Sequence, residues 1–185
     1  GHVAGARSLP GGRGKYAPGM YKAKGVELVG EEKVVSCDAQ GNQRALKTAY
    51  GKTILVGAVV AGIGVEPNIE LAESIGLTTE KGIVVDEFLR TGEADIYAAG
   101  DVAVFHNPAL DKRMRVEHED NANTMGRLAG RNMAGKSERY DHLPFFYSDM
   151  FELGYEAVGE LDSRLEMFAD WKRPNEEGVV YYLKG

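Results

Sequence analysis

The chain has 185 residues, enough for one large domain or parts of two, and its 22 Lys plus Arg and 28 Asp plus Glu give a formal net charge of −6. An acidic chain with scattered basic residues gives no support to nucleic-acid binding. The single cysteine, Cys37, excludes an internal disulfide and a cysteine zinc cluster, and it favours a reducing, cytoplasmic compartment. The longest nearly apolar run is too short to span a membrane, no secretory signal is visible, and the histidines lack metal-ligand spacing.

In chain order, residues 1–20 show no useful periodicity, and we expect them to be poorly ordered or non-native. Residues 25–35 have a strand-like pattern, and the polar run 38–42 predicts the turn of a β-hairpin. Residues 53–61 are continuously apolar and rich in β-branched side chains. This pattern predicts a strand that is buried on both faces, as in a parallel sheet covered by helices.

A glycine turn follows this strand at Gly62 and Gly64. It is not a pyrophosphate-binding loop, because the G-x-G-x-x-G pattern that opens a long helix is incomplete. Two interpretations stay open: a plain strand-to-helix turn, or a turn that lets a nicotinamide or flavin ring come close. A short helix over 69–75 is predicted next, ending at Gly76. Its apolar side is expected to hold Leu71, Ala72 and Ile75.

Two short strands, 82–86 and 96–99, come next, and the second leads directly into Gly100 and Asp101. In an open α/β sheet, ligands bind beyond the carboxyl ends of the strands. A glycine there lets the backbone approach a ligand, and a carboxylate there accepts hydrogen bonds from sugar hydroxyls. An ordinary turn has the same sequence, so this feature alone leaves both interpretations open.

The clearest helix is predicted over 117–133 and ends before Gly135. Its periodic apolar positions are Ala122, Met125, Ala129 and Met133. Gly126 and Gly130 lie four residues apart and predict a close approach of this helix to a sheet. The carboxylates at its start are explained by capping of the helix dipole. Alternatively, this end, with Glu117 and His118, suits a carbonyl that gains negative charge, as in a reduced flavin.

The rest of the chain is β-rich, with strands predicted at 155–161 and 179–183. An aromatic cluster at 143–149 either packs at an interdomain seam or forms a wall beside a flat ring. Apolar strands alternating with helices before residue 142 predict an α/β fold, and the β-rich tail predicts a small appended domain.

Five sequence blocks occur in a specific order: GVEPN (64–68), GIVVD (82–86), LRT…IYAAGDVA (89–103), RVEH…NA…GRLA (115–129) and FYSD (146–149). Together they resemble the carboxyl-terminal half of the FAD-dependent pyridine-nucleotide reductases, most closely the branch of apoptosis-inducing factors and ferredoxin-reductase components. The resemblance covers about residue 21 to the end. It implies an α/β fold, part of a reductase with two dinucleotide-binding folds, and a small β-rich α+β carboxyl-terminal domain.

The resemblance also implies domain limits and site residues. The limits place a poorly ordered or non-native start at 1–20, the end of the NAD(P)-binding domain at 21–78, the second part of the FAD-binding domain at 79–142, and a truncated, reductase dimerisation-like domain at 143–185. The matching cofactor-binding positions are Gly64, Gly100, Asp101, Val102, Glu117, His118, Glu119, Tyr147 and Glu156. Asp101 matches the aspartate that binds the FAD ribityl chain, and Glu117 with His118 matches the catalytic, NAD-contacting pair. Tyr147 stands where the branch usually has Trp, which leaves charge-transfer behaviour open.

The activity implied for the intact protein is hydride transfer from NAD(P)H to FAD, with electrons passed on to a protein or quinone acceptor. A homodimer is a further option. Neither of the two Gly-rich pyrophosphate loops of the family is found in this sequence, so we expect a fragment that binds both nucleotides poorly and is inactive alone. Two alternatives remain: a redox-responsive interaction protein whose cofactor switches dimerisation or partner contacts, or an inactive remnant.

Overall fold

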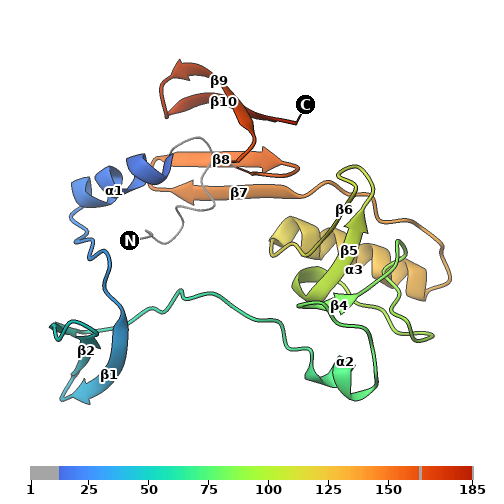
Figure 1. The fold of residues 1–185 in the computed structure, drawn as a ribbon, viewed down its shortest axis with the longest axis horizontal. Helices are drawn as coiled ribbons and strands as arrows, with labels where there is room; N and C mark the ends of the chain where they lie inside the picture. The colour runs from blue at the N-terminus through green and yellow to red at the C-terminus, as the bar shows by residue number, and fades with distance from the viewer. Residues whose placement is uncertain (1–12, 163, 185) are drawn as a thin grey trace. The chain divides into compact units, whose positions relative to one another are not determined.

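The computed structural model describes residues 13–162 and 164–184, and Figure 1 shows the order of their helices and strands. The chain divides into two compact units: one holds the residues up to 64 together with those from 162 onward, and the other holds 65–161. None of the described helices is both long and apolar enough to cross a membrane.

Helix α1 (Arg13–Ala23) corrects part of the expectation for residues 1–20, of which 1–12 lie outside the described residues. Periodicity missed this helix because it has no pronounced apolar stripe and contains Pro18. A better signal for this helix was the glycine that follows its last turn. Gly25 has a left-handed backbone with φ of +81°, and the Val26 N–H donates to the carbonyl of Tyr21 at 3.0 Å. This is the hydrogen bond of a Schellman cap.

The first unit contains an antiparallel sheet of β1 (Val34–Gln40), β2 (Gln43–Thr48) and β3 (Thr53–Val56) in that order. The predicted hairpin turn at 38–42 is confirmed, although narrower, because Gln40 pairs with Gln43. The strand expected over 25–35 is mostly wrong. Only its last two residues belong to β1, and the segment before them is a loop and bends.

The predicted buried parallel strand at 53–61 is wrong in length, direction and burial. Regular strand ends at Val56, and β3 pairs antiparallel with β2. Leu55 is 49% exposed and Val60 is 97% exposed. A strand with apolar side chains on both faces needs a layer on each face, and the described residues of this unit do not supply them.

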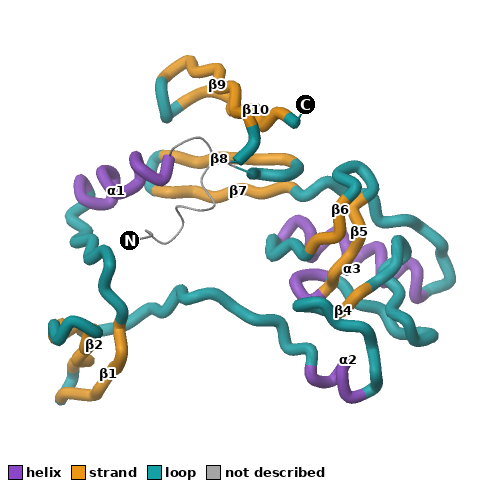
Figure 2. Tube along the Cα trace, viewed as in Figure 1, coloured by secondary structure: helices purple, strands orange, loops and turns teal. Residues whose placement is uncertain are grey.

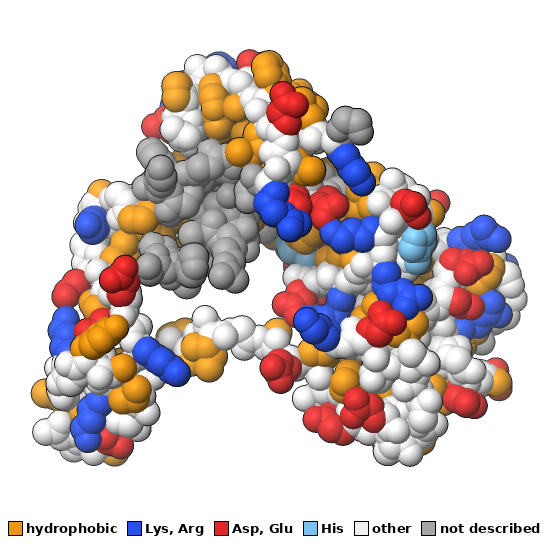
Figure 3. Space-filling view, in the orientation of Figure 1, with side chains coloured by type: hydrophobic (Ala, Val, Ile, Leu, Met, Phe, Trp, Pro, Cys, Tyr) orange, Lys and Arg blue, Asp and Glu red, His pale blue; other side chains and the backbone are white. Residues whose placement is uncertain are grey.

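A second hairpin in the same unit consists of β9 (Glu166–Arg173) and β10 (Glu177–Leu183). The strand expected at 179–183 is therefore confirmed, whereas β9 was not predicted. Figure 3 shows hydrophobic side chains gathered on this hairpin, and the Phe168 and Tyr181 rings lie 6.1 Å apart.

The other unit begins with α2 (Glu70–Ser74), followed by β4 (Ile83–Val84), the 3-10 turn η1 (Gly100–Val102), β5 (Ala103–Asn107) and β6 (Lys112–Met114). Strand β5 pairs parallel with β4 and antiparallel with β6. Figure 2 shows how short these three strands are beside the loops of this unit. Helix α3 (Glu119–Met133) and the hairpin of β7 (Phe145–Met150) and β8 (Leu153–Val158) complete it. The strand expected at 155–161 overlaps β8, which starts and ends earlier.

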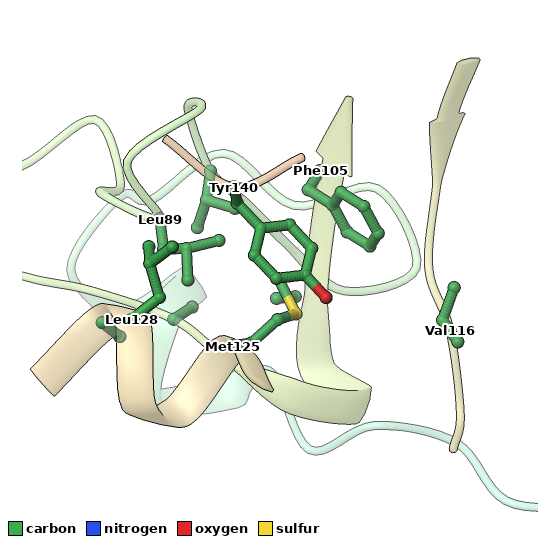
Figure 4. Close-up of a cluster of buried hydrophobic side chains, with 10 residues drawn as sticks. Leu89, Phe105, Val116, Met125, Leu128 and Tyr140 are labelled. Atoms are coloured by element: carbon green, nitrogen blue, oxygen red, sulfur yellow. The ribbon is translucent and has the colours of Figure 1, made fainter. Parts of the chain in front are cut away.

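Helix α3 covers a core that β5 and the neighbouring loops complete. In Figure 4, Met125 and Leu128 of α3 lie beside Leu89 and Tyr140, with Phe105 on β5. These five side chains are at most 7% exposed because α3 turns its apolar stripe toward the sheet.

Several local expectations for this unit need correction. The apolar side of the 69–75 helix is buried only at Ala72, because Leu71 is 81% exposed and Ile75 is 51% exposed. Residues 96–99 are not a regular strand: Tyr97 makes only an isolated bridge to Arg90. The strand that carries the core in this region is instead β5.

The prediction that Gly126 and Gly130 bring α3 close to a sheet is also wrong. A Cβ added at either glycine meets nothing within 4 Å, because both lie outside the buried stripe. Met133, expected on that stripe, is 66% exposed. The helix begins at Glu119 rather than 117, and Gly135, with φ of +89°, follows its end as expected.

Candidate cofactor-binding site

The start of α3 is capped by a histidine. His118 has extended backbone angles, and its Nδ1 accepts a hydrogen bond from the Asp120 N–H at 3.4 Å. Caps are usually Ser, Thr, Asp or Asn. At the other ring nitrogen, the Tyr147 N–H donates to His118 Nε2 at 3.3 Å, and the Tyr147 carbonyl oxygen lies 3.4 Å from the same atom. Both nitrogens of the ring therefore have backbone partners.

Tyr147, on strand β7, contacts both His118 and Glu119. Its Oη donates to Glu119 Oε2 at 2.6 Å, and its ring lies edge-to-face with the His118 ring at a centroid distance of 4.9 Å. The hydrogen bond to Glu119, aided by that negative charge, raises the pKa of Tyr147. Glu156 is the cross-strand partner of Tyr147, so both side chains lie on the same face of the hairpin.

The Gly100–Val102 turn packs against the same end of α3. Gly100 is buried with φ of +77°, and an added Cβ would lie 3.4 Å from the Cβ of Ala122, in the first turns of α3. Glycine suits both the left-handed backbone and this close approach. The next residue, Asp101, is exposed.

Arg115 connects this turn with the residues before α3. Its Nη1 donates to the carbonyl oxygen of Asp101 at 2.8 Å, and its Nη2 lies 2.5 Å from Glu117 Oε1. The two acceptors come from segments 16 residues apart in sequence numbering. A single planar guanidinium thus holds the Asp101 turn and the Glu117 carboxylate together.

The structure therefore gathers most of the predicted site around the start of α3. The gathered positions are Gly100, Asp101, Val102, Glu117, His118, Glu119, Tyr147 and Glu156. Gly64 is different: it belongs to the other compact unit, where it lies in a loop with φ of +96°. Among the described residues there is no cluster of three or more His, Cys, Asp or Glu side chains that would hold a metal ion.

Sequence reasoning missed a buried polar network directly behind the site. Asn121 is fully buried; its Nδ2 donates to the Val116 carbonyl at 3.3 Å and lies 3.2 Å from Met125 Sδ. Tyr140 Oη donates to Asn121 Oδ1 at 2.8 Å, and burial together with the Asp120 charge raises the pKa of Tyr140. The available signal was a polar residue four positions before Met125, on the apolar face of the helix.

The linker to the β7–β8 hairpin is also fixed at this end of α3. His142 Nε2 lies 2.5 Å from Asp120 Oδ2, and Asn107 Nδ2 donates to the His142 carbonyl at 2.9 Å. At the same open end of the hairpin, Glu160, which follows β8, pairs with Lys112 of β6. The hairpin and the α/β core are therefore joined at two places.

Two family models match the chain. One, described as pyridine nucleotide-disulphide oxidoreductase, matches residues 7–126, and one described as the carboxyl-terminal region of mitochondrion-associated apoptosis-inducing factor matches residues 129–182. A mitochondrial apoptosis-inducing factor 1 from Dictyostelium discoideum is 37% identical over 147 residues, covering 72% of this chain and 27% of that protein. Putidaredoxin reductase from Pseudomonas putida is 30% identical over 169 residues, covering 90% and 40%.

Solved structures agree with these matches. The ferredoxin reductase for the CYP199A2 system of Rhodopseudomonas palustris superposes with a TM-score of 0.82 at 27% identity, covering 95% of this chain and 44% of that one. Putidaredoxin reductase in its covalent complex with putidaredoxin gives a TM-score of 0.81 at 30% identity, covering 93% and 42%. These likenesses confirm the predicted fold class. The chain spans between about a quarter and two fifths of the length of the curated relatives it matches.

Proposed function

Since the chain belongs to the pyridine nucleotide-disulphide oxidoreductase family, we propose that it forms the carboxyl-terminal part of a flavoprotein that oxidises NAD(P)H and passes electrons to a protein or quinone acceptor. The observation that carries this proposal is the gathering of flavin-side and nicotinamide-side positions around the start of α3. The relatives named putidaredoxin reductase and ferredoxin reductase support an acceptor of the ferredoxin type.

The residues present have the chemistry that FAD requires. Asp101 is an exposed carboxylate, suited to accept hydrogen bonds from ribityl hydroxyls, and the buried Gly100 keeps side-chain atoms away from that turn. The start of α3, a helix of 15 residues, carries a partial positive charge that favours a carbonyl gaining negative charge. Tyr147 is 46% exposed and offers a flat ring beside it. Val102 and Glu119 complete the flavin-side group.

To the nicotinamide side of this group we assign Glu117, His118 and Glu156, and for the other unit we separately propose Gly64 as a cofactor-binding position. The Glu117 carboxylate is held by Arg115, and the His118 ring is fixed by its cap hydrogen bond and by contacts with Tyr147 and Phe146. These two side chains therefore position the substrate rather than move freely. FAD, when bound, supplies the hydride-accepting chemistry, and the protein supplies orientation and electrostatics.

The domain limits at 21–78, 79–142 and 143–185, a homodimer and a cytoplasmic location belong to the same proposal. The exposed apolar segment after β3, where Val60 is 97% exposed, lies within 21–78, and we propose that other parts of the whole reductase cover it.

The test uses the protein encoded by the complete reading frame. Its visible spectrum is recorded, NADH is added anaerobically, and flavin bleaching is followed with and without ferredoxin-type or quinone acceptors. Fast bleaching followed by fast reoxidation supports the reductase. Fast bleaching with a long-lived charge-transfer band and a changed mass in solution would favour the redox-responsive interaction protein. A protein without a yellow cofactor would refute both.

Site roles are tested with two substitutions in that protein. His118→Ala should slow flavin reduction more than it weakens FAD retention, because His118 faces the nicotinamide side. Asp101→Ala should do the reverse. Equal behaviour of the two variants would contradict the assigned roles.

A further inference from the structure

Arg115 lies between β6 and α3 and is more enclosed than most charged side chains of its unit, with 22% of its side chain exposed. Its two terminal nitrogens serve different partners: Nη1 donates to the Asp101 carbonyl at 2.8 Å, and Nη2 lies 2.5 Å from Glu117 Oε1. The guanidinium therefore has one neutral and one charged acceptor. Hydrogen bonds with charged groups are the stronger class.

The aliphatic stem of the Arg115 side chain is held in place as well as its guanidinium head group. A Cβ added to the buried Gly82 would lie 3.0 Å from Arg115 Cδ and 2.6 Å from the Val102 carbonyl oxygen. The stem thus runs through a tightly packed space between the start of β4 and the Gly100–Val102 turn. A side chain confined along its length holds its head group in a narrow range of positions.

We propose that Arg115 is a positioning residue that sets the Glu117 carboxylate and the Asp101 turn in one fixed relation. This inference rests on the proposed function, in which Glu117 contacts the nicotinamide nucleotide and Asp101 contacts FAD. Arg115 itself touches neither nucleotide in this assignment. It acts through its two partners, so the flavin-side and nicotinamide-side contacts are set by one side chain.

The geometry requires arginine rather than any cation. Two acceptors are reached by two nitrogens of one rigid plane, whereas a lysine ammonium is a single point donor on a flexible stem. Arg131 offers a matched control. It makes a comparable ion pair with Glu138 at 2.7 Å, at the other end of α3 and away from the site.

The experiment uses the FAD-loaded protein from the complete reading frame and the variants Arg115→Gln, Arg115→Lys, Glu117→Gln, Arg115→Gln/Glu117→Gln and Arg131→Gln. We measure the KM for NADH, kcat, and, independently of activity, the FAD dissociation constant by flavin fluorescence. Arg115→Gln should raise the KM about tenfold, equivalent to one charge-assisted contact, and should raise the FAD dissociation constant as well. Arg131→Gln should change neither by more than about twofold.

The double variant decides whether Arg115 acts through Glu117. In the Glu117→Gln background, Arg115→Gln should add less than about a twofold change in KM, because the partner is already lost. Effects of the two substitutions that multiply would overturn the proposal. Full recovery in Arg115→Lys would also overturn it, because a charge alone would then suffice.

Two further outcomes separate this proposal from the proposed function. A wild-type protein that is not reduced by NADH would overturn both. A wild type that is reduced normally, with Arg115→Gln matching Arg131→Gln in KM and FAD affinity, would overturn only the role of Arg115. Should Arg115→Gln fail to fold, Arg115→Lys keeps the test: a KM equal to that of wild type overturns the proposal.

Discussion

Tyr140→Phe removes one oxygen atom from the network behind the site. Tyr140 is 2% exposed, its Oη donates to Asn121 Oδ1 at 2.8 Å, and its ring packs edge-to-face on Phe105 at 5.1 Å. Phenylalanine keeps this ring contact. The substitution therefore removes only the hydrogen bond, and it leaves the buried side-chain amide oxygen of Asn121 without a hydrogen-bond donor.

A buried acceptor that loses its partner destabilises a protein by roughly 1–3 kcal/mol. Asn121 lies in the first turns of α3 and holds the Val116 carbonyl at 3.3 Å, so the loss falls on the start of this helix. If this loss appears entirely as easier local opening of the helix, amide exchange becomes about 5- to 160-fold faster.

Hydrogen exchange followed by mass spectrometry measures this effect locally, even in a protein with several domains. Peptides from α3 should exchange faster in Tyr140→Phe, whereas peptides from the β9–β10 hairpin in the other unit serve as the internal control. The double variant Asn121→Leu/Tyr140→Phe should be destabilised by less than the sum of the two single variants. Removing both groups leaves neither an unpaired Asn121 amide nor an unpaired Tyr140 hydroxyl. Unchanged α3 exchange in Tyr140→Phe, or strictly additive effects, would refute the reasoning.

Three further predictions concern single positions. Gly100→Ala should weaken FAD binding in a fluorescence titration, because φ of +77° costs alanine about 1–2 kcal/mol and its Cβ would meet Ala122 at 3.4 Å. Glu119→Gln should lower the pKa of Tyr147 toward its ordinary value, seen as phenolate absorbance at lower pH than in wild type and absent in Tyr147→Phe. Because the folded state raises the pKa of Tyr140, its hydroxyl stabilises the fold fully below about pH 10, and the stability advantage of wild type over Tyr140→Phe in urea titrations should shrink above that pH.

Features of the fold that depend on neighbouring residues in sequence could be predicted. The β1–β2 turn, the end of α2 at Gly76 and the end of α3 at Gly135 each follow from local backbone preferences, and both glycines have positive φ. Features that depend on a covering layer could not. The run at 53–61 has the composition of a buried strand, but burial is decided by what packs on its faces, and Val60 is almost fully exposed.

The candidate site also has features that could be predicted from the sequence and features that could not. The order of the sequence blocks was enough to nominate residues such as Asp101 and Tyr147, but the contacts between them depend on side-chain conformations that no spacing specifies. The hydrogen bond from Tyr147 to Glu119 spans 28 positions, and the contact from Arg115 to Asp101 spans 14. Asn121 was missed for a different reason: periodicity counts apolar residues, and a polar residue on the buried face of a helix is invisible to it.

His118 illustrates why capping and site geometry belong together here. A serine or asparagine at this position would cap α3 equally well, but only an aromatic ring also contacts Tyr147 and Phe146. The His118 Nδ1 accepts from the Asp120 N–H, and its Nε2 lies within hydrogen-bond distance of both the N–H and the carbonyl oxygen of Tyr147. Contacts at both ring nitrogens, together with the two neighbouring rings, fix the plane of the imidazole. A residue held in this way contributes a fixed shape, which is the contribution expected of a group that orients a nucleotide ring.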